Sequence, residues 1–104
     1  MLAVNGRAKE ELKRILSAKA DNPQVVVRLI TSHPGEFCLG IDVETPDDHV
    51  VEHKGSKVLL VDHELANSLE GYTLAFEDKK FVMAKGPLSG FNKSVVTFHG
   101  KERK

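Results

Sequence analysis

The 104-residue chain has little cysteine, no tryptophan, no long apolar run and no net charge. Its single cysteine, Cys38, excludes an internal disulfide and a structural zinc site built from two to four thiolates. No apolar run approaches the roughly 20 residues that cross a bilayer, and no apolar stretch follows a basic start, so neither a membrane helix nor a secretory signal is predicted. Its 15 basic and 15 acidic residues balance, whereas a generic nucleic-acid binder carries a basic excess. We therefore expect a cytoplasmic protein that binds neither membranes nor nucleic acid.

The length predicts one domain over residues 1–104, because 104 residues are close to the commonest domain size. A composition of 40% hydrophobic and 29% charged residues is ordinary for a globular protein. Secondary-structure patterns weaken beyond Lys85, so segment 85–104 is the least determined part of this domain.

The clearest local pattern predicts an amphipathic helix from Asn5 to about Lys19. Apolar residues recur in it with helical spacing, at Ala8, Leu12, Ile15 and Leu16. Asn5 suits the N-cap, because its side-chain oxygen can accept from the unpaired N–H groups of the first turn. Glu10 precedes Arg14 by four residues, a spacing that favours an ion pair on a helix.

Strand patterns fill most of the remaining chain. Strands are predicted over residues 25–30, 37–44, 49–53, 56–61, 72–76, 81–83 and 95–98. In segment 37–44 every second residue is apolar, which predicts a half-buried strand whose polar face includes Cys38. Gly55 is expected to supply a positive φ in a tight hairpin, and Asp62 to cap a short second helix followed by Gly71. This order predicts an α+β fold of mostly antiparallel sheets with an N-terminal amphipathic helix.

Charge is unevenly distributed along the chain. Segment 36–53 contains six acidic and no basic residues, whereas the first 20 residues carry five basic against two acidic groups. The simplest interpretation is a set of solvated faces. The alternative is a polar molecule that docks partners, including its own copies, through charge.

Cys38 is the obvious candidate for chemistry. A nucleophilic cysteine needs a nearby base or cation to form its thiolate. The acidic neighbours Glu36 and Asp42 do the opposite, so we expect a structural, inert cysteine.

Histidines and paired carboxylates give no stronger signal. His49 and His53 share one face of a predicted strand but lie about 13 Å apart, too far for one metal ion, and the histidines are expected at the surface. Asp47 and Asp48 follow Pro46 and fit a turn better than a catalytic pair. No catalytic, metal-binding or cofactor-binding residue is therefore assigned.

Several segments nevertheless follow a familiar order. Ala8–Leu16 reads A-x-x-x-L-x-x-I-L, the strand Val27–Ile30 follows, and Ser32–Phe37 forms a turn that leads into a further strand. Asp48–Asp62 contains D-x-V-V-E-x-x-G-x-K, and Leu69–Leu74 reads L-x-G-x-x-L. In this order and spacing, the chain as far as about Met83 resembles HesB/IscA-like domains, the A-type iron–sulfur carriers.

The resemblance implies the HesB-like fold, but the chain departs from the family at its ligands. Family carriers hold iron or an iron–sulfur cluster with three cysteines, one in a Gly-Cys-Ser-Gly turn and two in a C-terminal Cys-Gly-Cys. Pro34 stands where the first is expected, Cys38 falls four positions late, and no cysteine follows Phe81. Since such clusters need thiolates, the resemblance implies a degenerate member that lacks the cluster ligands.

The expected function is that of a non-enzymatic protein-binding or scaffold module with no cofactor, related to iron–sulfur cluster assembly, with a protein partner or self-association. Two alternatives stay open. One is an iron or iron–sulfur carrier that uses Cys38 across a homodimer, and the other is an enzyme with Cys38 as nucleophile.

Overall fold

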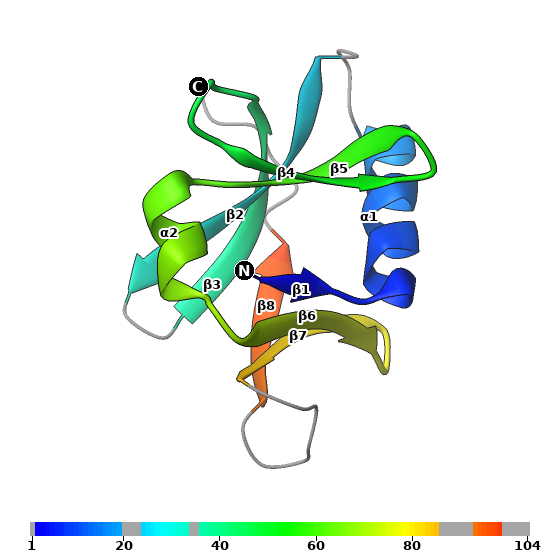
Figure 1. Cartoon of the computed structure of the whole chain (residues 1–104). Coiled ribbons are helices and arrows are strands. Elements are labelled where there is room, and N and C mark those ends of the chain that lie inside the picture. Colours follow the sequence, from blue (N-terminus) through cyan, green and yellow to red (C-terminus); the bar gives the residue numbers. More distant parts are fainter. Residues whose placement is uncertain (1, 20–23, 34–35, 86–92, 99–104) are drawn as a thin grey trace.

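The computed structural model describes residues 2–19, 24–33, 36–85 and 93–98, which form two helices and eight strands (Figure 1). In chain order they are β1 (Ala3–Val4), α1 (Gly6–Lys19), β2 (Val25–His33), β3 (Glu36–Val43), β4 (His49–His53), β5 (Ser56–Val61), α2 (His63–Ser68), β6 (Tyr72–Glu77), β7 (Lys80–Lys85) and β8 (Lys93–Phe98). No helix in these ranges is both long enough and apolar enough to span a membrane.

The strands form one mixed sheet in the order β1-β6-β7-β8-β3-β2-β5-β4. Hairpin neighbours pair antiparallel, as do β7 and β8, but β1–β6, β2–β5 and β3–β8 pair parallel. The α+β class and the two helices agree with the sequence prediction, whereas the mostly antiparallel sheet is only partly confirmed. The parallel pairs join strands that are distant in sequence, which local hairpin patterns do not report.

Helix α1 packs across the opening between the two ends of the curved sheet, against β4 and β5 at one end and β6 at the other (Figure 1). The predicted cap is present, because the Ala8 backbone N–H donates to Asn5 Oδ1 at 2.9 Å. Ala8 and Leu12 are completely buried, as their helical spacing predicts. The expected Glu10–Arg14 ion pair is wrong, because Arg14 pairs with Glu11 instead. Residues three apart are neighbours on a helix surface just as residues four apart are, so either glutamate was within reach.

Two tight hairpins shape the sheet. Lys54 and Gly55 turn β4 into β5 with φ of 54° and 84°, and Asp78 and Lys79 turn β6 into β7 with φ of 51° and 66°. Two consecutive positive φ values give a turn whose twist matches that of the flanking strands. Gly55 was expected to adopt this conformation, whereas Lys54, Asp78 and Lys79 adopt it without being glycine.

The short helix α2 begins as its sequence predicts, but its C-cap is Leu69, and Gly71, the predicted cap, lies in the turn that follows. Asp62 accepts a hydrogen bond from the Glu64 backbone N–H at 3.2 Å, which confirms the N-cap. Gly71 has φ of 84°, and Tyr72 N–H donates to Leu69 O just before it, so the chain reverses into β6.

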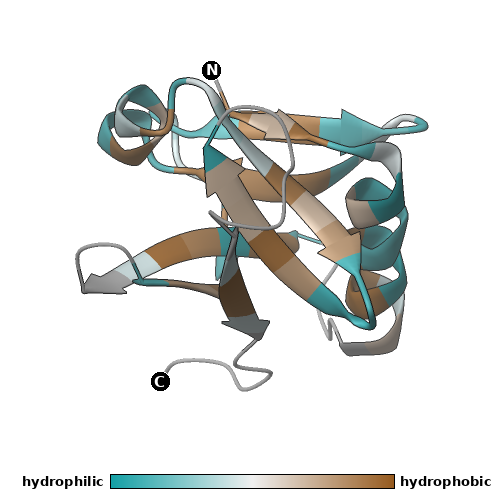
Figure 2. Ribbon diagram, turned by 90° about the horizontal axis from the view of Figure 1, so that it is seen from below, coloured by the Kyte–Doolittle hydropathy of each residue, from teal (hydrophilic) through white to brown (hydrophobic). Residues whose placement is uncertain are grey.

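Apolar residues of the strands form the core, whereas hydrophilic residues dominate the turns and α1 (Figure 2). The prediction that only one face of β3 is buried is wrong. Cys38 and Gly40, on the face expected to be exposed, are buried, and Val43, on the face expected to be buried, is 50% exposed. Strand β3 lies between β2 and β8, and Ile30 of β2, opposite Cys38, extends over Gly40. A β-carbon at Gly40 would lie 3.1 Å from Ile30 Cδ1, so glycine makes this close packing possible.

Candidate functional site

The face of β2 and β3 that carries Cys38 is the first place to look for chemistry. Cys38 lies opposite Ile30 on β2 and Thr97 on β8, and its side chain is 8% exposed. Within the described residues, no base or cation is hydrogen-bonded to its Sγ atom. The thiol therefore lies in the middle of the sheet, and the residues that the structure describes around it include no group bonded to it that would activate it.

The same face carries a partly buried ion pair that the sequence did not predict. Arg28 Nη1 and Nη2 donate to the two carboxylate oxygens of Asp48 at 2.8 and 2.7 Å. Arg28 Nε donates to Asp42 at 2.8 Å, and Nη2 also donates to the Val43 carbonyl at 3.1 Å. The guanidinium thus ties the segment after β3 to the middle of β2 through a bidentate pair, the strongest form of such contacts.

Asp48 is held on every side. Its side chain is 1% exposed and also accepts from the Thr45 backbone N–H at 2.8 Å. The hydrogen bonds from the Arg28 guanidinium lower the pKa of Asp48 to about 2 and outweigh the opposing effect of burial. The prediction that this residue serves a turn is confirmed, because Asp48 N–H donates to Thr45 O across the turn.

A shallow hollow opens beside this cluster, between the β2–β3 pair and α2. Acidic residues Asp42, Asp62 and Glu64 lie around it, with Ile30 and Leu65 supplying apolar surface. Arg28 also lines the hollow, but its donors are directed to Asp42, Asp48 and the chain itself. The cluster is therefore a clamp, in the sense that its hydrogen bonds fix the 44–48 turn to β2, and its donors are already used within the protein rather than free to bind a ligand.

The histidines are arranged differently from the sequence expectation. His49 stacks on His63, with ring centroids 5.8 Å apart and an angle of 11° between the rings. The β4–β5 register pairs His49 with Val61, and His63 follows Val61 by two residues, so the two histidine rings lie close together. The predicted hairpin over 49–61 already implied this proximity. His63 is exposed as expected, but His49 and His53 are half-buried, and His53 Nε2 is enclosed with no partner among the described residues.

No group of three or more metal-binding side chains converges within the described ranges. Pro34, where the resemblance places a first cysteine ligand, lies outside these ranges, as do residues 99–104. The chain carries no thiol at either place, because its one cysteine is Cys38.

No protein-family model matches this chain, and no curated protein matches its sequence. Solved structures do share its fold. Escherichia coli SufA, involved in the biosynthesis of iron–sulfur clusters, is 21% identical, with 90% of this chain and 80% of SufA covered and a TM-score of 0.58. A Lactobacillus acidophilus protein assigned to Fe–S biosynthesis is 15% identical, with 95% of this chain and 89% of that protein covered and a TM-score of 0.53. IscA with a 2Fe–2S cluster is 16% identical, with 81% of this chain and 82% of IscA covered and a TM-score of 0.51.

Proposed function

Because the chain has the HesB/IscA-like fold, we propose that it is a non-enzymatic protein-binding or scaffold module related to iron–sulfur cluster assembly, without the cysteine ligands of the carriers. The proposal takes residues 1–104 as one HesB-like domain of a cytoplasmic protein, with no resident cofactor. One observation carries it: the single thiol of this carrier-like body is buried in the centre of its sheet.

The position of Cys38 supports this function in two ways. A cluster ligand must reach iron together with other thiolates, usually four in total, and the chain supplies one. A nucleophile must reach a substrate, but the Cys38 side chain is 8% exposed and lacks a base or cation bonded to it in the described residues. We therefore expect Cys38 to react with iodoacetamide no faster than a free cysteine, and faster alkylation would favour an enzyme.

Anaerobic reconstitution tests the absence of the cluster. The purified chain is incubated with ferrous iron, sulfide and a reductant, desalted, and examined by visible absorption and by iron and sulfide analysis. We expect no stoichiometric cluster, and equal residual iron on the wild type and on Cys38→Ser. A stable cluster in the wild type would overturn the proposal.

The second candidate is an iron or iron–sulfur carrier that uses Cys38 across a homodimer. One observation favours it, namely that the similar IscA structure holds a 2Fe–2S cluster. This candidate requires the Cys38 thiol, which is buried between β2 and β8, to become exposed and meet the Cys38 thiol of another copy. It predicts metal on the protein as isolated, a dimer that persists on dilution, and loss of iron in Cys38→Ser; unchanged iron in that variant would reject it.

A further inference from the structure

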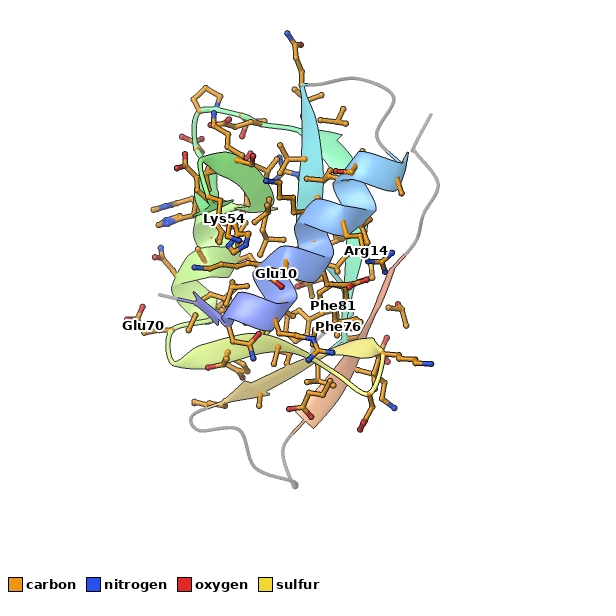
Figure 3. All side chains as sticks on the ribbon, turned by 90° about the vertical axis from the view of Figure 1, so that its right-hand side faces the viewer. Glu10, Arg14, Lys54, Glu70, Phe76 and Phe81 are labelled. Atoms are coloured by element: carbon orange, nitrogen blue, oxygen red, sulfur yellow. The ribbon has the colours of Figure 1, made fainter. Side chains whose placement is uncertain are left out.

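A groove with an apolar floor runs beside α1, on the side of the molecule away from α2 (Figure 3). Its floor comes from Ile15 of α1, Phe76 and Phe81 of the β6–β7 hairpin, and Val96 of β8, which pairs with Phe81 on the same face of the sheet. Phe76 and Phe81 pack edge to face, with ring centroids 4.9 Å apart. Phe81 and Val96 are buried, but Ile15 and Phe76 are partly exposed, so the floor offers apolar surface to a ligand.

The rim of this groove is cationic. Arg14 lies at one side, where Glu11 holds its guanidinium. Lys79 and Lys80 lie at the other side, on the β6–β7 turn, and no carboxylate among the described residues lies within ion-pair distance of either. The groove therefore combines an apolar anchor site with two positive charges that have no partner there.

The positive surface continues over α1. A smaller hollow on the other side of the helix is lined by Lys13, His53 and Lys54 together with Arg14, which borders both hollows. Glu10 is the acidic member of this second lining, and Figure 3 shows Glu10 and Lys54 on this flank of the helix. An extended ligand in the groove would thus meet cations along both flanks of α1.

We propose that this groove, which we call the α1 groove, binds an acidic segment of a partner protein. An apolar side chain of that segment would pack on Ile15 and Phe76, while its carboxylates would approach Lys79 and Lys80. The charge complementarity and the apolar floor together select this occupant. The inference rests on the proposed function as a protein-binding module and names the surface and the chemistry of the partner.

Other occupants fit less well. A nucleic acid or anionic bilayer needs a dominant positive field, but the whole chain is neutral and Glu11 lies in the groove. A second copy of this chain would have to present its acidic side, where Asp42 and Asp48 are already bonded to Arg28 and Glu44 to Lys57. A head-to-tail contact between two different faces would also generate a ring or an open chain of copies rather than a two-fold dimer.

The test is a titration of the full-length, ¹⁵N-labelled protein with three synthetic peptides, followed by NMR. The first peptide alternates glutamates with leucine and phenylalanine, the second replaces the apolar residues with serine, and the third replaces the glutamates with lysine. We expect only the first to shift the amides of Ile15, Lys79 and Val96 in a saturable manner. Absence of saturable binding, or shifts centred on α2, would overturn the proposal.

Variants then separate the groove from general electrostatics. Lys79→Gln combined with Lys80→Gln should weaken the first peptide about tenfold, because two exposed ion pairs are lost. The matched control, Arg7→Gln with Lys9→Gln, removes the same charge from α1 outside the groove lining and should change the affinity less than about twofold. Equal losses in both double variants would overturn the proposal. Ile15→Ser, a change on the partly exposed floor, should abolish binding in a variant whose NMR spectrum shows it folded, and retained binding would contradict the apolar anchor.

Two further measurements distinguish the possible failures. Sedimentation of the protein alone at rising concentration should show no association that Lys79→Gln and Lys80→Gln remove; such association would assign the groove to a second copy. Titration with an anionic vesicle or a single-stranded oligonucleotide should leave the groove amides unshifted. Because none of these measurements involves iron, failure of the groove proposal is distinct from the appearance of a cluster, which would contradict the proposed function.

Discussion

The two charged sides of this molecule use their charges in opposite ways. On the side of β2, β3 and α2, Arg28 binds two acidic residues of segment 36–53, the enclosed Asp48 and the exposed Asp42. On the α1 side, Lys79 and Lys80 border an apolar groove with no carboxylate in ion-pair distance among the described residues. The whole chain has no net charge, so the total charge does not distinguish the two sides. What distinguishes a structural cluster from a binding surface is whether its charged side chains are paired.

Asp48→Asn should have the largest effect on stability among the changes to these two sides. The variant leaves the Arg28 guanidinium largely buried with one charge partner removed, and we expect the free energy of unfolding to fall by about 3 kcal/mol. Urea unfolding followed by circular dichroism measures it, with an unchanged dependence on urea showing that the folded state is comparable. In a double-mutant cycle with Arg28→Gln, the effect of Asp48→Asn should largely disappear; additive losses would show that the two residues do not act as a pair.

Acid should weaken the same cluster next. The pKa of Asp48 is lowered to about 2 by the hydrogen bonds from Arg28, so its carboxylate stabilises the fold fully above the pKa of the unfolded chain, near 4. This contribution of about 2 kcal/mol is lost as the pH falls from about 5 through 2. Urea unfolding at a series of pH values should show this loss in the wild type and a shallower one in Asp48→Asn. Identical pH profiles would show that Asp48 does not carry the effect.

Asp42→Asn provides the matched, exposed comparison. Asp42 binds the same guanidinium at the same 2.8 Å distance, but its side chain is 54% exposed. Solvent screening limits such a pair, and we expect a loss of less than about 1 kcal/mol in the same unfolding experiment. A loss equal to that of Asp48→Asn would remove the distinction between the buried and exposed arms of the clamp.

The smallest expected effect on stability comes from the other side. Lys79→Gln with Lys80→Gln should change the free energy of unfolding by less than about 0.5 kcal/mol, because neither lysine has an ion-pair partner in the described residues. Peptide binding should nevertheless decrease, as set out for the α1 groove. A large loss of stability would indicate that these lysines serve the fold rather than a ligand.

Local features of the fold were predictable from the sequence, and distant pairings were not. The Asn5 and Asp62 caps and the Gly55 turn depend on neighbours within a few residues, so their patterns are legible in the chain. Order and spacing of short motifs gave the fold, which the solved structures confirm. The position of β8 between β7 and β3 depends on residues far apart in sequence, and no local period encodes it.

The candidate sites show the same limit. Arg28 is the one charged residue in the otherwise apolar run 25–30, a signal for a buried ion pair, but its partner Asp48 lies 20 residues away. Cys38 was correctly placed opposite the apolar face of β3, yet its burial depends on the strands and side chains around it. The α1 groove joins a helix near the start of the chain with a turn and a strand near its end, so no single segment contains its pattern.

The place of β8 also bears on how this protein is made. Residues 93–98 leave the ribosome after β3 and β7, and among the described residues they alone pair with both of these strands. Until they emerge, the nascent chain has two inner strands with open hydrogen-bonding edges, the kind of edge on which chains aggregate. Completion of the sheet therefore waits for these residues, and a stop codon before Lys93 should yield an aggregating product rather than a shorter folded one.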